Sequence, residues 1–116
     1  MDAGTAMKVR LRADLVVAMK QGARNEAALM RQLIAALDNA EAAPMRIESA
    51  SLVRHEFGAG TAEVARLALD EARVREILTD EIAGRETAAA EYERLGEGVR
   101  AAALRAEAEL ARRYVG

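Results

Sequence analysis

The chain has 116 residues, a net charge of −2 and 52% hydrophobic residues, of which only three are aromatic. This length is enough for one domain with one core. The absence of cysteine excludes disulfides, thiolate metal sites and thiol nucleophiles, and no stretch approaches the roughly 18 apolar residues that a membrane span needs. The first ten residues lack the apolar segment of a signal peptide, so we expect a cytoplasmic protein with no membrane partner.

The first helical segment is expected to begin near residue 8. Residues 1–6 show no pattern, and we expect them to be disordered or extraneous. One helical face is then formed by Leu11, Leu15, Ala18 and Met19. Gly22 predicts the end of this helix, because glycine adopts the left-handed conformation common at helix C-termini.

The second segment has the clearest helical spacing and is predicted at about 25–42. Its apolar face consists of Met30, Leu33, Ile34 and Leu37. Asn25 is the predicted N-cap, and Pro44 is expected just beyond the end of the helix. The two segments predict a helical hairpin over about 8–42.

A connector at 43–69 separates this hairpin from the next. It is expected to be short-helical or irregular, because Gly58-Ala59-Gly60 interrupts it and Thr61 is a candidate start for a short helix ending near Leu69.

A second hairpin is predicted at about 70–115, with Asp70 as N-cap and Gly96 at the turn. The face of its first helix comprises Val74, Ile77, Leu78, Ile82, Ala89 and Tyr92, and that of its second comprises Val99, Ala103, Ala106, Leu110 and Tyr114. The expected i,i+4 ion pairs are Glu71–Arg75, Glu81–Arg85 and Glu109–Arg113. The predicted fold is therefore all-α. A single domain at 7–116 contains four main helices in a bundle of two hairpins, which pack together to bury their apolar faces.

No catalytic, metal-binding or cofactor-binding constellation is visible. His55-Glu56 lacks the second histidine of a metalloprotease helix, and a single histidine without cysteine makes a zinc site improbable. The Gly58–Gly60 segment lacks the third glycine and the preceding strand of a phosphate loop. The carboxylates Glu76, Asp80 and Glu81 lie near arginines and are interpreted as a solvated, ion-paired face rather than an acid–base or metal site. We expect no cofactor and no catalysis.

The best functional candidates are basic residues of the first hairpin. They are Lys8, Arg10, Arg12, Lys20, Arg24 and Arg31, which give residues 7–31 a local charge of +4, whereas residues 32–116 have a charge of −5. One interpretation is that they contact the phosphates of a nucleic acid. The other is that they solvate the outer faces of two helices. No aromatic residue lies among them, which argues against stacking on single-stranded bases.

Two blocks of the chain resemble the GatB/YqeY family. In the first hairpin, Leu11, Asp14, Ala18, Met19 and Lys20 look like the opening helix of that family, and Arg31, Leu33, Ala35, Ala36, Asn39, Ala40 and Glu41 look like its "LRxLxAAIxNAE" segment. In the second hairpin, Glu81, Ile82, Arg85, Tyr92, Gly96, Ala106, Glu107, Glu109 and Tyr114 look like "EIxxRxxxxxxFxxxG…AExExLxxYL" without a gap. The resemblance covers residues 7–115 and concerns the N-terminal subdomain of the family.

This resemblance implies an all-α accessory domain related to the tail of the B subunit of glutamine-dependent aspartyl/glutamyl-tRNA amidotransferases. Such a domain is amidotransferase-like, and so related to carbon–nitrogen ligases, by kinship only: it contacts tRNA and performs no chemistry. The expected function is thus a non-catalytic binding module for tRNA or for a translation-linked partner. The alternative is a helical protein-interaction or self-association module, whose apolar stripes pair with helices of another protein or of a second copy.

Overall fold

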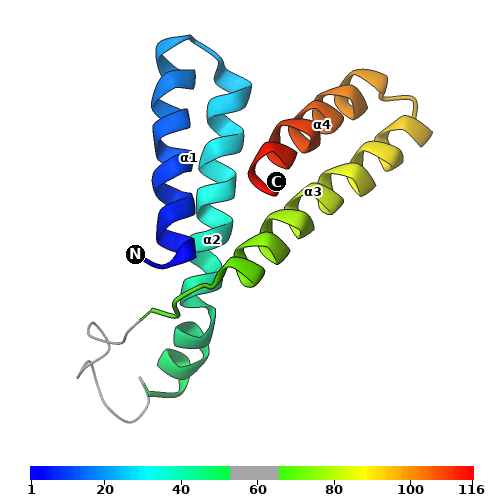
Figure 1. The fold of residues 1–116 in the computed structure, drawn as a ribbon. Coiled ribbons are helices and arrows are strands. Elements are labelled where there is room, and N and C mark those ends of the chain that lie inside the picture. The colour runs from blue at the N-terminus through cyan, green and yellow to red at the C-terminus, as the bar shows by residue number, and fades with distance from the viewer. Residues whose placement is uncertain (53–65) are drawn as a thin grey trace.

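The computed structural model of the protein describes residues 1–52 and 66–116, and the side chains of residues 1–42 and 66–116. The helices are α1 (Ala3–Lys20), α2 (Arg24–Leu52), α3 (Glu71–Arg94) and α4 (Gly98–Ala111), and a 3₁₀ turn follows at Arg112–Tyr114. No strand occurs in this part of the chain, which confirms the predicted all-α class. Figure 1 shows that α1 and α2 form one hairpin and that α3 and α4 form a second. No helix among the described residues is both long and apolar enough to cross a membrane.

Helix α1 begins at Ala3, and this corrects the prediction that residues 1–6 lie outside the fold. The Asp2 carboxylate caps the helix by accepting a hydrogen bond from the Thr5 backbone N–H at 2.8 Å. The Gly4 N–H also donates to the Leu69 carbonyl at 3.2 Å, which ties the first turn to a distant segment. Apolar periodicity did not reveal this start, because a cap and a backbone contact hold the turn in place.

Glycines close the two hairpin turns, as predicted. Gly22 has φ +70° and Gly96 has φ +80°, values that residues with a side chain rarely adopt. After α1, the Ala23 N–H bonds to the Ala18 carbonyl at 2.8 Å, and the Gly22 N–H bonds to that of Met19 at 3.2 Å. These two bonds form a Schellman motif, which satisfies carbonyls at the helix end. Each turn therefore reverses the chain within a few residues and makes the two helices neighbours.

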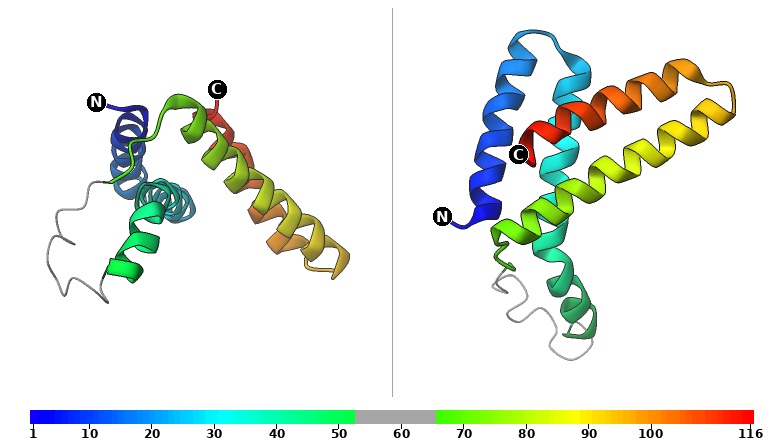
Figure 2. Two further views of the ribbon diagram at one scale, coloured as in Figure 1. Left: turned by 90° about the horizontal axis from the view of Figure 1, so that it is seen from below. Right: turned by 45° about the vertical axis from the view of Figure 1, so that its right-hand side comes forward.

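Helix α2 differs from its prediction at both ends. It begins at Arg24, and the Ala27 N–H bonds to the Ala23 carbonyl, so Asn25 lies in the first turn and is not the N-cap. The reason is that the Gly22 turn leads directly into the new helix. At the other end α2 continues to Leu52, past Pro44. A proline inside a helix removes one backbone donor and commonly bends the axis. Figure 2 shows the last turns of α2 inclined to the earlier ones.

The second hairpin confirms one predicted face and corrects the other. The Asp70 carboxylate caps α3 by accepting from the Arg73 N–H at 2.8 Å. The predicted α3 face is buried except for the half-buried Tyr92. On α4 the buried residues are Ala101, Ala108 and Ala111, whereas Val99 is 87% exposed. Small residues allow α4 to approach α3 closely, so the alanine face packs there. Of the predicted face, Tyr114 lies in the core and Leu110 packs against it, whereas Val99, Ala103 and Ala106 are exposed.

The core lies where the two hairpins meet. Its fully buried large side chains are Leu11, Leu29, Leu33, Leu37, Leu69 and Leu78. They come from α1, α2, α3 and the segment before α3, so one core joins both hairpins. Each buried leucine stabilises the fold by about 1.5–3 kcal/mol relative to an exposed one.

Away from this core the hairpins diverge, as both views in Figure 2 show. The Cα radius of gyration is 17.0 Å, whereas a chain of this length is expected to have about 13 Å if compact. An open groove of about 900 Å³ lies between the start of α2 and α4. The predicted α4 face residues Ala103, Ala106 and Leu110 line this groove. Both hairpins therefore keep long faces that no described residue covers.

Candidate nucleic-acid interface

The predicted basic residues separate into two groups in the structure. Lys8 is buried, and Arg10 is exposed but contacts the C-terminal turn, whereas Arg12, Lys20, Arg24 and Arg31 are exposed and make no such contact. We call these last four residues the hairpin cations. The division follows from the contacts that each side chain makes.

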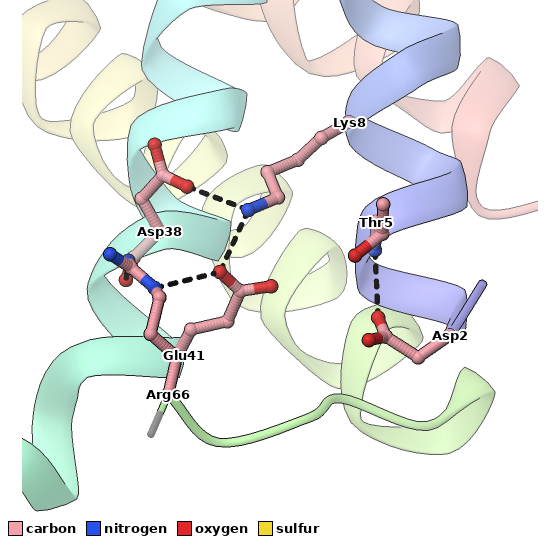
Figure 3. A network of polar contacts seen from close by, with 6 residues as sticks. All are labelled: Asp2, Thr5, Lys8, Asp38, Glu41 and Arg66. Carbon is pink, nitrogen blue, oxygen red and sulfur yellow. Dashed lines mark hydrogen bonds and ion pairs between the residues drawn. The ribbon is translucent and has the colours of Figure 1, made fainter. Parts of the chain in front are cut away.

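Lys8 is buried in an ion-pair network with Asp38, Glu41 and Arg66, which we call the Lys8 network (Figure 3). The Lys8 Nζ donates to Asp38 Oδ1 at 2.8 Å and to Glu41 Oε1 at 2.7 Å. Lys8 is 9% exposed and Glu41 5% exposed. Burial by itself disfavours the charged ammonium, but the hydrogen bonds and charges of the two carboxylates outweigh it and raise the pKa of Lys8. The ammonium is therefore charged at neutral pH and occupied, so we leave it out of the proposed contact set.

The Lys8 network also holds the segment that leads into α3. Arg66 lies 3.4 Å from the Glu41 carboxylate and donates to the Asp38 carbonyl at 2.9 Å. The next residue, Leu67, donates its N–H to the Glu41 carbonyl at 3.0 Å. These donors bond to carbonyls of α2 and hold the segment before α3 against that helix.

Arg10 contacts the C-terminal turn of the chain. Its guanidinium carbon lies 4.6 Å from the centroid of the Tyr114 ring, and it donates to the Arg113 carbonyl at 3.2 Å. The Tyr114 hydroxyl donates to the Asp14 carboxylate. Burial, together with the bond to the carboxylate, raises the pKa of Tyr114 to about 12. Arg10 and Tyr114 thus join α1 to the end of the chain by a cation–π contact.

The hairpin cations make no ion pair with any carboxylate among the described residues. In contrast, the second hairpin pairs most of its arginines with carboxylates. Those pairs are Arg73–Glu76, Arg85–Glu81, Arg85–Glu107, Arg94–Glu91, Arg105–Glu93, Arg112–Glu86 and Arg112–Glu109. The first hairpin therefore holds unpaired positive charge, whereas most of the positive charge of the second hairpin is paired with carboxylates.

The hairpin cations occupy the half of the first hairpin nearest its turn. Lys20 ends α1 and Arg24 begins α2, on either side of Gly22. Arg12 and Arg31 lie about 10–12 Å further along their helices, given a rise of about 1.5 Å per residue. Arg24 and Arg31 are two turns apart, so they share a face, and both line a shallow hollow of about 520 Å³ beside Met19. Arg24 and Arg31 can contact phosphates on one face of α2 without reading bases.

The structure places the other candidates as follows. His55-Glu56 and Gly58-Ala59-Gly60 lie outside the described residues. Among the carboxylates, Glu76 pairs with Arg73, and Glu81 pairs with Arg85 at 3.0 Å as predicted.

Two other predicted i,i+4 partners bond elsewhere. Arg75 donates to the Val115 carbonyl, and Glu109 pairs with Arg112 at 3.5 Å. A tertiary contact with the C-terminal turn replaces the first predicted pair, and a local i,i+3 pair replaces the second. Within the described parts of the chain, no cluster of three or more acidic or histidine side chains could hold a metal ion.

Sequence reasoning missed the Lys8 network. Lys8 is 30 residues from Asp38 and 33 from Glu41, so no local spacing places the ammonium beside the two carboxylates. A signal was nevertheless present, because Glu41 continues the apolar face of α2, and a carboxylate on a buried face requires a partner.

No family model, curated protein or solved structure matches this chain.

Proposed function

We propose that the chain is a non-catalytic module that binds tRNA through the hairpin cations, as the GatB/YqeY resemblance implies. One observation supports this proposal above others: the hairpin cations are unpaired among the described residues, whereas most arginines of the second hairpin are paired with carboxylates. A cation without an internal partner can release counterions when it meets a phosphate, and this release drives binding to nucleic acid.

The module would contact the phosphate backbone of a folded RNA rather than read its base sequence. The hollow beside Met19 has arginines at its edge and no aromatic side chain among its lining residues. Base stacking is therefore absent from the proposed contact, and phosphate contacts supply the affinity. The acidic second hairpin would face away from the RNA, because like charges repel.

The test is fluorescence anisotropy with labelled total tRNA, from low salt to about 150 mM, with duplex DNA as competitor. The variant is Arg12→Ala/Lys20→Ala/Arg24→Ala/Arg31→Ala. Each lost phosphate contact is expected to reduce the slope of log affinity against log salt by about one.

A matched control makes the same change in charge at other exposed arginines. It is Arg73→Ala/Arg94→Ala/Arg105→Ala/Arg112→Ala, which removes four cations that are paired with carboxylates. The control should keep most of the tRNA affinity. Equal losses in the two variants would show that net charge alone causes binding, and binding that duplex DNA removes as readily as tRNA would contradict the proposal.

A second candidate function is a helical protein-interaction module. The observation that favours it is the exposed apolar surface of α1, which includes Val9, Val16 and Val17 at 50%, 48% and 51% exposure. Analytical ultracentrifugation over a range of concentrations tests the self-association form of this candidate. A single monomeric species would leave another protein as the partner.

A further inference from the structure

Helix α1 is apolar on its outer side as well as on its core side. Its core face includes Leu11 and Ala18, which are buried. On the opposite side, Val9, Val16 and Val17 are exposed. A surface helix normally places polar residues there, and a helix that is apolar all round is usually covered on both sides. The outer side of α1 therefore has the composition of a contact surface.

The exposed residues follow the spacing of a coiled-coil seam. Ala6, Val9, Ala13, Val16 and Lys20 are separated by alternating steps of three and four residues. This spacing is that of heptad positions a and d, which keep one stripe facing a partner helix. All five residues are exposed, and we call them the α1 stripe. Its small side chains allow a second helix to approach closely.

Positive charge borders the α1 stripe. On one side the flanking heptad positions hold Arg12 and Met19, and on the other they hold Arg10 and Val17. Lys20 continues the stripe at its end. The one acidic residue within Ala3–Lys20 is Asp14. It lies outside the stripe and accepts a hydrogen bond from the Tyr114 hydroxyl. A partner with carboxylates at its own flanking positions would complement this surface.

A second copy of this chain fits the α1 stripe poorly. If two α1 helices paired antiparallel about Ala13, the two Arg12 side chains would meet near the centre. Like charges at the border of a seam are destabilising. A phosphate backbone can contact Arg12 and Lys20, but it has no aliphatic surface to cover the valines of the stripe.

We propose that the α1 stripe docks an amphipathic helix of another protein, with small or branched apolar residues at its seam and Asp or Glu at the flanking positions. This inference deepens the second candidate function. It shares Arg12 and Lys20 with the proposed tRNA contact, and Arg24 and Arg31, which lie on α2, separate the two proposals. The docked helix would lie along α1 on the side opposite the core, where α2 does not reach.

The probe is a synthetic helical peptide of about three heptads with Ala and Leu at a and d and Glu at e and g. A matched peptide has Lys at every Glu position. Binding to the whole chain is measured by isothermal titration calorimetry. The Glu peptide is expected to bind saturably, and the Lys peptide is expected to bind at least about tenfold more weakly.

Variants of the protein then assign the surface. Val9→Gln/Val16→Gln should weaken binding of the Glu peptide about tenfold or more, because two valines lose their apolar contacts. The matched control, Leu95→Gln/Val99→Gln, changes exposed apolar residues outside the stripe and should bind as the unchanged protein does. Arg12→Glu/Lys20→Glu should reverse the preference toward the Lys peptide. Far-UV circular dichroism checks that each variant is folded.

The outcomes separate this inference from the other proposals. Loss of tRNA binding in Val9→Gln/Val16→Gln would overturn it and assign the stripe to nucleic acid. A concentration-dependent dimer that the same variant abolishes would overturn the acidic partner but keep α1 as an interaction surface. Absence of peptide binding would overturn the inference, and absence of a dimer would overturn the self-association form of the second candidate. Arg24→Ala/Arg31→Ala should reduce tRNA binding and leave peptide binding unchanged.

Discussion

Removing the Lys8 ammonium should destabilise the fold more than removing any exposed charge. Lys8→Met keeps most of the aliphatic volume but leaves Glu41, whose side chain is 6% exposed, without its closest cation. Breaking a buried ion pair costs about 3–5 kcal/mol, and the lower end applies here, because Arg66, whose side chain is 56% exposed, stays 3.4 Å from the carboxylate as its remaining cation. A domain of this size has a total free energy of unfolding of about 5–15 kcal/mol, so this loss would be a large fraction of it.

The assay is urea denaturation followed by far-UV circular dichroism at neutral pH. The midpoint should fall by more than about 1 M, since the urea dependence of small domains is about 1–3 kcal/mol per M. Lys8→Met/Glu41→Leu should recover most of the loss, because it removes both charges together. Arg73→Ala, which breaks the exposed Arg73–Glu76 pair, should cost less than about 1 kcal/mol.

The effect should also depend on pH with a definite sign. The pKa of Lys8 is raised in the folded protein, so its contribution is fully present below the unfolded value of about 10.4. It is lost as pH rises through the folded pKa. The difference in the free energy of unfolding between the unchanged protein and Lys8→Met should therefore narrow only above about pH 10.4. A gap of less than about 1 kcal/mol at pH 7 would refute the reasoning, because the Lys8 network would then behave like a surface ion pair.

Three further results are expected. Gly4→Ala should lower the free energy of unfolding by about 1–3 kcal/mol, because the new Cβ would lie 3.1 Å from Leu69 Cβ; unchanged stability would contradict the close packing seen there. Gly84→Ala should raise the free energy of unfolding by about 1 kcal/mol, because a Cβ added at this exposed helical site would meet no other part of the protein within 4 Å. A decrease would show that the glycine is needed. In a Tyr92→Phe background, ultraviolet absorbance should show Tyr114 ionising near pH 12. Since this pKa is raised on folding, its contribution to stability is present below about pH 10 and is lost as pH rises to 12; a midpoint near 10 would mean that the ring is not buried.

The candidate site was only partly predictable from the sequence. The charge excess of residues 7–31 identified the hairpin that carries the unpaired hairpin cations, because net charge is a sum over residues and needs no geometry. Net charge did not distinguish the buried, ion-paired Lys8 from the exposed Arg24. The first is enclosed by carboxylates of α2, and the second is exposed at the hairpin turn. That distinction depends on the direction in which each side chain points relative to a helix about 30 residues away.

Local chemistry determined the class of the fold and most of its boundaries. Asp70 caps α3 and the glycines at 22 and 96 end helices as expected, because each acts through bonds within a few residues of itself. The apolar spacing around Leu33 also needed only the period of the helix. Such features are encoded where they act, so they can be read in order along the chain.

Tertiary structure alone decided which faces meet. The sequence offered α4 two apolar faces, and the alanines at 101 and 108 pack on α3 while Val99 stays exposed. It offered α1 two as well, and the Leu11 side became the core while the Val16 side did not. The choice follows from the combined packing of all helices, since one face of each helix can be buried only when its neighbours are in place. Periodicity therefore predicted the helices, but their packing decided which faces remain free to bind a partner.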